Sequence, residues 1–155
     1  MTLQLLSIAI ALTPAALQAQ WTTEWSYEGP RGPRHWAALD PAYAACNSKE
    51  QSPIDIGSSE KAQLPALRFD YHAAPLQFLL NNGYAIRVNY HGGGQYLTAG
   101  GERYQLTQFH FHRPSEELIH GKPSDMAIHL MHESSSGKVA GVTVLLTAGE
   151  PNATI

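Results

Sequence analysis

The sequence has 155 residues, a net charge of −3 and 43% hydrophobic residues, which suit one globular domain with a core of its own. Acidic residues outnumber Lys and Arg by 13 to 10, which argues against a nucleic-acid partner because such a partner requires a basic face. The unusual feature is a set of eight histidines, and neutral imidazole is the commonest side-chain metal ligand.

Residues 1–19 have the pattern of an export signal. Leu3 to Leu12 form a mostly apolar run, Pro14 interrupts it, and small residues up to Ala19 suit a signal peptidase, although no Lys or Arg precedes the run. The run is shorter than the roughly 20 residues of a membrane-spanning helix. We expect a signal peptide over 1–19, one domain over 20–155, a periplasmic or extracellular location and no membrane attachment after cleavage. The alternative is a short buried helix.

Cys46 is the single cysteine of the sequence. Cysteines of exported proteins usually pair, because the compartment is oxidising. A lone cysteine then means a free thiol, an intermolecular bridge or a partner outside the residues given. We favour the last of these.

A short helix is predicted to open near Pro33, a residue that suits the first helical turn. It should end by Asp40, because Pro41 disfavours helical backbone in the residue before it.

Beyond this helix the hydrophobic pattern has the two-residue period of strands. Apolar and polar residues alternate over 86–90, and the glycines at 92–94 are predicted to form a hairpin turn into a strand at 95–98. Further strands are predicted over 103–112, 126–132 and 139–146. The sequence therefore predicts a mainly β fold, with a large, twisted, mostly antiparallel sheet and a few short helices.

The segment Gln108 to His112 (Q-F-H-F-H) places two histidines on one face of a strand. Because side chains alternate between faces, His110 and His112 lie roughly 6.5–7 Å apart along the backbone, and their rings can converge on one ion. His129 can supply a third ligand if its strand lies beside the first. His132 then faces the other way and is expected to be a hydrogen-bonded structural histidine.

Three histidines with a fourth position left to water are typical of a catalytic zinc site. Bound zinc lowers the pKa of water to about 7, so such a site suits attack on a small electrophilic carbon, or hydrolysis. The alternative is that the H-x-H pattern marks two half-buried histidines bonded to the backbone. Glu116, taken alone, is more often a solvated loop carboxylate than a catalytic group.

Several motifs together resemble those of the α-class carbonic anhydrases, and the variant at residues 113–122 resembles the bacterial, secreted branch. They occur in the family's order and the match runs from Trp25 to about Leu146. The motifs are Trp25-Ser26-Tyr27, residues 32–36, Q-S-P-I-D-I at 51–56, Asn81-Asn82-Gly83, Q-F-H-F-H at 108–112, Ser115-Glu116 and H-L-M-H at 129–132. The resemblance implies the family's fold and a lyase that reversibly hydrates carbon dioxide to bicarbonate and a proton through a zinc-bound hydroxide. It indicates no oligomeric state.

The resemblance also implies roles for individual residues. The zinc ligands would be His110, His112 and His129. Gln108 would contact His110 and fix its tautomer and orientation without binding the metal itself. Glu116 matches the carboxylate that accepts a hydrogen bond from a hydroxide-orienting threonine. The remaining matches are Tyr27 and Asn82 on the solvent path, Met131 and Gly141 in the substrate pocket, and Tyr84 at the usual place of a proton-shuttling histidine.

Several residues depart from the family's pattern. Tyrosine has a pKa near 10 and is a poor proton relay at pH 7, so Tyr84 predicts slower, buffer-dependent turnover. Ala127 stands where many members have a glutamate bonded to the third histidine, so that contact is absent or replaced. Gly141 stands where a valine often walls the substrate pocket.

The family's G-S-L-T-T-P-P-C element does not occur in these 155 residues. In the family it carries the hydroxide-orienting threonine and a second cysteine. The resemblance therefore implies a C-terminally incomplete domain, which would leave Cys46 unpaired and Glu116 without its usual partner.

Two other classes of protein compete with this interpretation. A cupin-type metalloenzyme also has an H-x-H motif with a glutamate soon after it, as in His110-x-His112-x-x-x-Glu116, but the second cupin element is missing. A carbonic-anhydrase-like non-catalytic binding module would resemble the enzymes and would typically lack one or more zinc histidines, whereas all three are present here.

Overall fold

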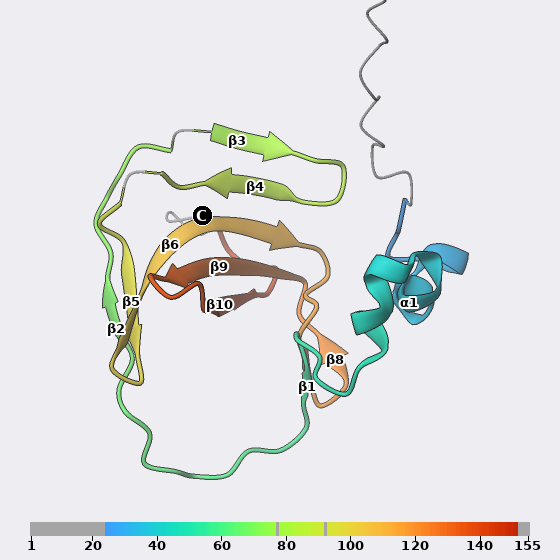
Figure 1. Ribbon diagram of the computed structural model, residues 1–155, viewed down its shortest axis with the longest axis horizontal. Helices are drawn as coiled ribbons and strands as arrows, with labels where there is room; N and C mark the ends of the chain where they lie inside the picture. The colour runs from blue at the N-terminus through green and yellow to red at the C-terminus, as the bar shows by residue number, and fades with distance from the viewer. Residues whose placement is uncertain (1–23, 77, 92, 152–155) are drawn as a thin grey trace, which may run out of the picture. The chain divides into compact units, whose positions relative to one another are not determined.

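The computed structural model describes residues 24–76, 78–91 and 93–151, so the predicted signal peptide lies outside the described residues. The chain forms two compact units, residues 1–49 and 50–155, and Figure 1 shows the helices of the first and the sheets of the second. None of the helices in the described ranges has the length and apolar character needed to cross a bilayer.

Short helical turns make up the N-terminal unit. The predicted helix at Pro33 is confirmed, and it ends at Asp40, which is extended (φ −154°) and whose side chain accepts a hydrogen bond of 2.8 Å from the Ala42 amide. Three aromatic rings, those of Trp25, Tyr27 and Trp36, pack edge to face with centroids 5.2–5.9 Å apart. The helical elements are η1 (Gly29–Arg31), η2 (Pro33–His35), α1 (Trp36–Leu39) and η3 (Pro41–Asn47).

Strands dominate the second unit, which confirms the predicted mainly β fold (Figure 1). A seven-stranded sheet has the order β10-β9-β6-β4-β3, with β5 also paired to β6 and β2 paired to β5, and all of these pairings are antiparallel. A small separate sheet has the order β1-β7-β8. The strands are β1 (Asp55–Ile56), β2 (Arg68–Asp70), β3 (Phe78–Asn81), β4 (Ile86–Asn89), β5 (Tyr96–Ala99), β6 (Glu102–His112), β7 (Leu118–Ile119), β8 (Lys122–Pro123), β9 (Met126–Ser134) and β10 (Val139–Leu146).

The predicted hairpin turn at the glycines is wrong. Strands β4 and β5, which flank the glycines, do not pair with each other; both pair with the long strand β6. β4 lies against residues 108–110 of β6 and β5 against residues 102–105. Gly93 and Gly94 therefore stand in the chain between two segments that pair with successive parts of β6. Gly93 and Gly94 have φ of 63° and 81°, a left-handed backbone that glycine adopts at little cost.

A β-bulge in β6 decides which side chains share a face. The register against β9 pairs Leu106 with His132 but Gln108 with Met131, so Thr107 is the extra residue. In a regular strand Leu106 and Gln108 would share a face, because the period is two. The bulge instead places Leu106 on the buried face with His132 and leaves Gln108 on the opposite face.

His132 confirms its predicted structural role on this buried face. It is 1% exposed, its Nε2 accepts a hydrogen bond of 2.6 Å from the Tyr71 hydroxyl, and its Nδ1–H donates to the Ala140 carbonyl at 3.3 Å. Burial lowers the pKa of His132 below 6.5. Leu106, the residue opposite His132 in the ladder, is also buried, as are Val88 and Leu97.

Candidate metal centre

The three histidines of the predicted site come together on the face of the sheet opposite His132. His110 on β6 stands directly opposite His129 on β9, and His112 lies two residues further along β6. The ring centroids are 4.8 Å apart for His110 and His112, 5.1 Å for His110 and His129, and 4.7 Å for His112 and His129. One nitrogen of each ring lies within 4.8 Å of the corresponding nitrogens of the others, so the three can serve one metal ion.

Gln108 fixes the orientation of the first ring. Its Oε1 accepts a hydrogen bond of 2.9 Å from the Nδ1–H of His110. Since Gln108 and His110 are two residues apart on β6, they share a face. The bond assigns the proton to Nδ1, so Nε2 carries the lone pair that a metal ion needs.

Glu117 fixes the orientation of the third ring, and sequence reasoning missed it. Nε2 of His129 lies 2.8 Å from Oε1 and 3.1 Å from Oε2 of Glu117, so the Nε2–H donates to the carboxylate and Nδ1 is left as the lone-pair nitrogen. The Thr143 hydroxyl donates to Oε1 at 2.7 Å. The available signal was the second glutamate in the Ser115-Glu116-Glu117 run together with the alanine at position 127.

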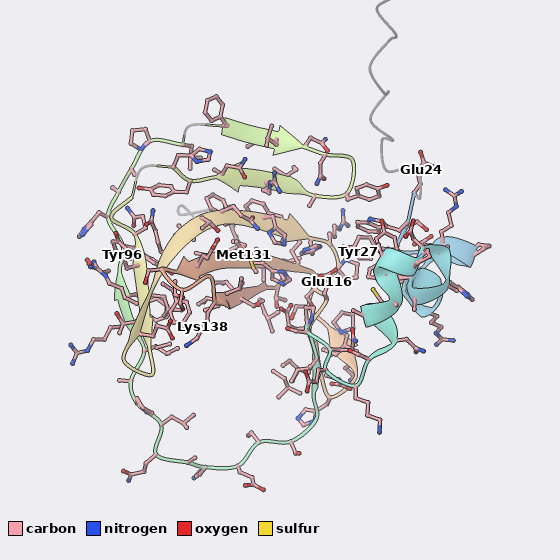
Figure 2. The ribbon with its side chains drawn as sticks, viewed as in Figure 1. Glu24, Tyr27, Tyr96, Glu116, Met131 and Lys138 are labelled. Carbon is pink, nitrogen blue, oxygen red and sulfur yellow. The ribbon has the colours of Figure 1, made fainter. Side chains whose placement is uncertain are left out.

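Glu116 lies beside the cluster, as predicted. Its Oε2 is 3.4 Å from Nε2 of His112 and 4.0 Å from Nδ1 of His129. Figure 2 shows Glu116 at the end of the sheet where β6 terminates, with Tyr96 and Lys138 at the opposite end. The carboxylate thus brings a negative charge to the nitrogens of two of the rings.

Burial favours the neutral form of two of these imidazoles, those of His110 and His112. Burial lowers the pKa of His110 to about 4, and the charges of His112 and His129 lower it further in the same direction. Burial also lowers the pKa of His112, although Glu116 opposes this. For Glu117, burial opposes ionisation, but the hydrogen bonds from Thr143 and His129 outweigh it and lower the pKa. The site therefore favours the neutral, metal-binding form of His110 and His112 and the ionised form of Glu117.

The two residues predicted to line the substrate pocket, Met131 and Gly141, lie opposite each other in the neighbouring strands β9 and β10. Met131 on β9 pairs with Gln108 on one side and with Gly141 of β10 on the other. A Cβ added to Gly141 would lie 3.8 Å from the Met131 sulfur, an ordinary van der Waals contact. A larger side chain at position 141 would thus meet Met131, and glycine leaves this space open.

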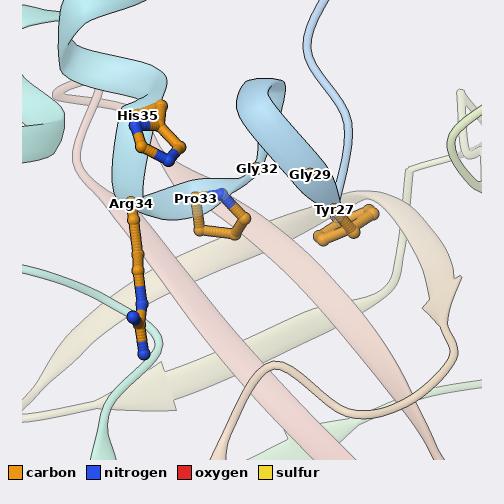
Figure 3. A pocket seen from close by; sticks show the side chains of 6 residues that line it. All are labelled: Tyr27, Gly29, Gly32, Pro33, Arg34 and His35. Atoms are coloured by element: carbon orange, nitrogen blue, oxygen red, sulfur yellow. The ribbon is translucent and has the colours of Figure 1, made fainter.

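The residues predicted to form the proton path, Tyr27, Asn82 and Tyr84, come from segments other than β6 and β9, the two strands that carry the histidines. Asn82 and Tyr84 belong to the turn between β3 and β4, where Oδ1 of Asn82 accepts hydrogen bonds from the amides of Tyr84 (3.0 Å) and Ala85 (2.8 Å). The Tyr84 side chain is 41% exposed. Tyr27 belongs to the N-terminal unit, where it borders a small pocket with Gly29, Gly32, Pro33, Arg34 and His35 (Figure 3).

Comparison with known proteins agrees with this geometry. The family model for eukaryotic-type carbonic anhydrase matches residues 31–146. A carbonic anhydrase of Klebsiella pneumoniae is 38% identical over 147 residues, which are 94% of this chain and 58% of the relative. One from Nostoc is 37% identical over 139 residues, 86% of this chain and 52% of the relative. The chain thus spans little more than half the length of these relatives.

A solved structure gives the same result for the fold. The α-carbonic anhydrase of Thermovibrio ammonificans, solved with sulfanilamide, is 37% identical and superposes with a TM-score of 0.76 over 84% of this chain and 58% of its own. The cupin interpretation of the H-x-H motif is therefore wrong. The chain belongs to the eukaryotic-type, or α-class, carbonic anhydrase family.

Proposed function

We propose that the protein is a zinc enzyme that reversibly hydrates carbon dioxide to bicarbonate and a proton at the cluster of His110, His112 and His129. The observation that carries the proposal is the convergence of three imidazoles from two neighbouring strands, two of which donate one ring N–H to a fixed acceptor, Gln108 or Glu117. The relatives named carbonic anhydrase support the same reaction.

The donor set fits zinc. At zinc–nitrogen distances of about 2.1 Å, two nitrogens of a tetrahedral site are ~3.4 Å apart. The corresponding nitrogens here lie within 4.8 Å of one another, so shifts of up to about 1 Å per ring bring them together. Three protein ligands leave a fourth position to water, as in catalytic sites. When bound, the ion supplies Lewis-acid chemistry that makes water a nucleophile near neutral pH.

The residues of the chain then have separate tasks. Gln108 holds the His110 ring and Glu117 the His129 ring, so that their lone pairs keep one direction during the reaction. Glu116 places a negative charge next to the ligands and provides an acceptor for a proton-bearing group in the pocket. Met131, with the space beside Gly141, provides an apolar surface for an uncharged substrate such as carbon dioxide.

The test is carbon dioxide hydration measured by stopped flow on zinc-loaded protein, with His112→Ala as the ligand variant. His91→Ala is the matched control, because His91 is exposed and lies outside the cluster. We expect a zinc-dependent rate that His112→Ala abolishes and His91→Ala leaves unchanged. Zinc binding without hydration would instead favour a non-catalytic binding module.

We also propose export to the periplasm or outside the cell, on the apolar run of Leu3 to Leu12. N-terminal sequencing of protein recovered from the periplasm tests it. We expect the first residue to be Gln20, and an intact Met1 would contradict this.

A further inference from the structure

The hydrogen bonds that orient the rings of His110 and His129 have acceptors from different parts of the chain. Gln108 lies two residues before His110 on the same strand and accepts its Nδ1–H. The corresponding position for His129 is Ala127, which shares its face and is 0% exposed. A methyl group cannot accept a hydrogen bond, so strand β9 offers His129 no equivalent partner.

The partner comes from another part of the chain. Glu117 lies in the segment after β6, and both of its carboxylate oxygens lie within 3.1 Å of Nε2 of His129. Its side chain is only 14% exposed, so water competes little for the bond. Charge-assisted hydrogen bonds of this kind are about twice as strong as neutral ones.

Two further contacts hold Glu117 itself. Thr143 is the residue opposite His129 in the β9–β10 ladder, and its hydroxyl donates to Glu117 Oε1 at 2.7 Å. Buried Ser115 donates from Oγ to the Glu117 carbonyl at 2.7 Å and accepts from the Ser124 amide at 2.8 Å. The Glu117 backbone and carboxylate are therefore both fixed.

We infer that Glu117, oriented by Thr143, is the positioning residue of the third metal ligand, and that strand β10 thereby contributes to metal retention. The inference rests on the proposed function, since it concerns the same metal site. Glu117 fixes the tautomer of His129 so that Nδ1 carries the lone pair, and its negative charge makes that nitrogen a better donor. Such partners typically change metal affinity by about 10–100-fold.

The first test uses metal-free protein. Nitrogen-15 NMR of the imidazoles should show His129 with a protonated Nε2 and a bare Nδ1 at neutral pH. Glu117→Ala should convert it to a mixture of tautomers. Glu117→Gln, which keeps an acceptor oxygen, should preserve the tautomer. A His129 tautomer unchanged in Glu117→Ala would overturn the inference.

The second test measures zinc affinity by competition with a chromophoric chelator. We expect Glu117→Ala to weaken binding about 10–100-fold, Thr143→Val to weaken it less, and Glu133→Ala, which removes an exposed glutamate of β9, to leave it unchanged. Placing the carboxylate at the β9 position, in Glu117→Ala combined with Ala127→Glu, should recover affinity if the double variant folds.

The outcomes separate the two proposals. Affinity in Glu117→Ala equal to that of the parent and of Glu133→Ala would overturn the positioning role, even in an active enzyme. A parent that binds zinc with the predicted Glu117 dependence but hydrates no carbon dioxide would refute the proposed function and leave the positioning role standing.

Discussion

His110 and His129 stand opposite each other in the ladder between β6 and β9, with ring centroids 5.1 Å apart. Each donates its outer N–H to an acceptor, Gln108 or Glu117, at 2.8–2.9 Å. Direct opposition in an antiparallel pair brings two side chains close on one face. The backbone pairing thus supplies the proximity, and the two acceptors supply the direction of the lone pairs.

The bond from His110 to Gln108 is predicted to support metal binding. Gln108→Leu removes the acceptor and frees the His110 tautomer, so zinc affinity should fall by about 10–100-fold. Chelator competition measures this. Gln108→Glu keeps an acceptor oxygen in place and should bind zinc at least as tightly as the parent. Equal affinity in Gln108→Leu would show that the bond has no role in metal binding.

Glu116 is predicted to support turnover without ligating the metal. Its Oε2 lies 3.4 Å from Nε2 of His112, and Glu116→Gln removes the charge while keeping the shape. We expect kcat to fall on the order of 10²-fold, with zinc stoichiometry retained. Hydration kinetics and metal analysis of the same sample measure both quantities. Loss of the zinc from Glu116→Gln would instead identify the carboxylate as a ligand.

Tyr84 is predicted to limit proton transfer. Phenols exchange protons poorly at pH 7, and the Tyr84 side chain is 41% exposed in the β3–β4 turn. Turnover of the parent should therefore rise with imidazole buffer concentration. Tyr84→His should raise turnover at low buffer and reduce the response to imidazole. A parent rate independent of imidazole would rule out this limitation.

The bond between Tyr71 and His132 is predicted to stabilise the fold. Tyr71→Phe leaves the buried Nε2 of His132 without its 2.6 Å partner, and an unsatisfied buried polar group costs about 1–3 kcal/mol. Urea unfolding should show that loss. Tyr104→Phe is a suitable control, because the Tyr104 hydroxyl donates to the Glu102 carboxylate at 3.2 Å and its removal leaves the bond between Tyr71 and His132 in place. An unchanged urea midpoint in Tyr71→Phe would contradict this account of the core.

His132 is also predicted to make stability pH-dependent. Burial lowers its pKa below 6.5 in the folded chain, so the unfolded chain binds a proton at pH values where the folded chain does not. The contribution of neutral His132 to the free energy of unfolding is fully present above about pH 6.5. It is lost as the pH falls towards the lower pKa that His132 has in the folded chain. The free energy of unfolding of metal-free His132→Leu should decline less steeply below pH 6.5 than that of the parent. His91→Ala, at an exposed position, should keep the parental slope, and equal slopes in His132→Leu and the parent would refute the prediction.

The two-residue alternation of apolar and polar residues predicted where the strands lie in the sequence, but only part of the order in which they pair. Strand β10 begins and ends at the predicted residues, and the period of two placed His110 and His112 on one face. The hairpin at the glycines was predicted wrongly, because glycine indicates a change of direction but does not specify which strand the next segment joins. The bulge at Thr107 depends on the pairing with β9, which no pattern within β6 reveals.

Residues that act through tertiary contacts were the hardest to predict. The alanine at position 127 showed that a contact to His129 was absent or replaced, but the replacement comes from Glu117. Which of two consecutive glutamates reaches His129 depends on the course of the backbone after β6, held by Ser115 and Ser124. Thr143 contributes only because its strand pairs with that of His129.

Metal analysis of folded protein tests the central claim most directly. We expect one zinc ion per chain, bound through three imidazole nitrogens by X-ray absorption and lost when His110, His112 and His129 are all replaced by alanine. Folded protein that binds no zinc, or that keeps its zinc after the triple replacement, would contradict the account.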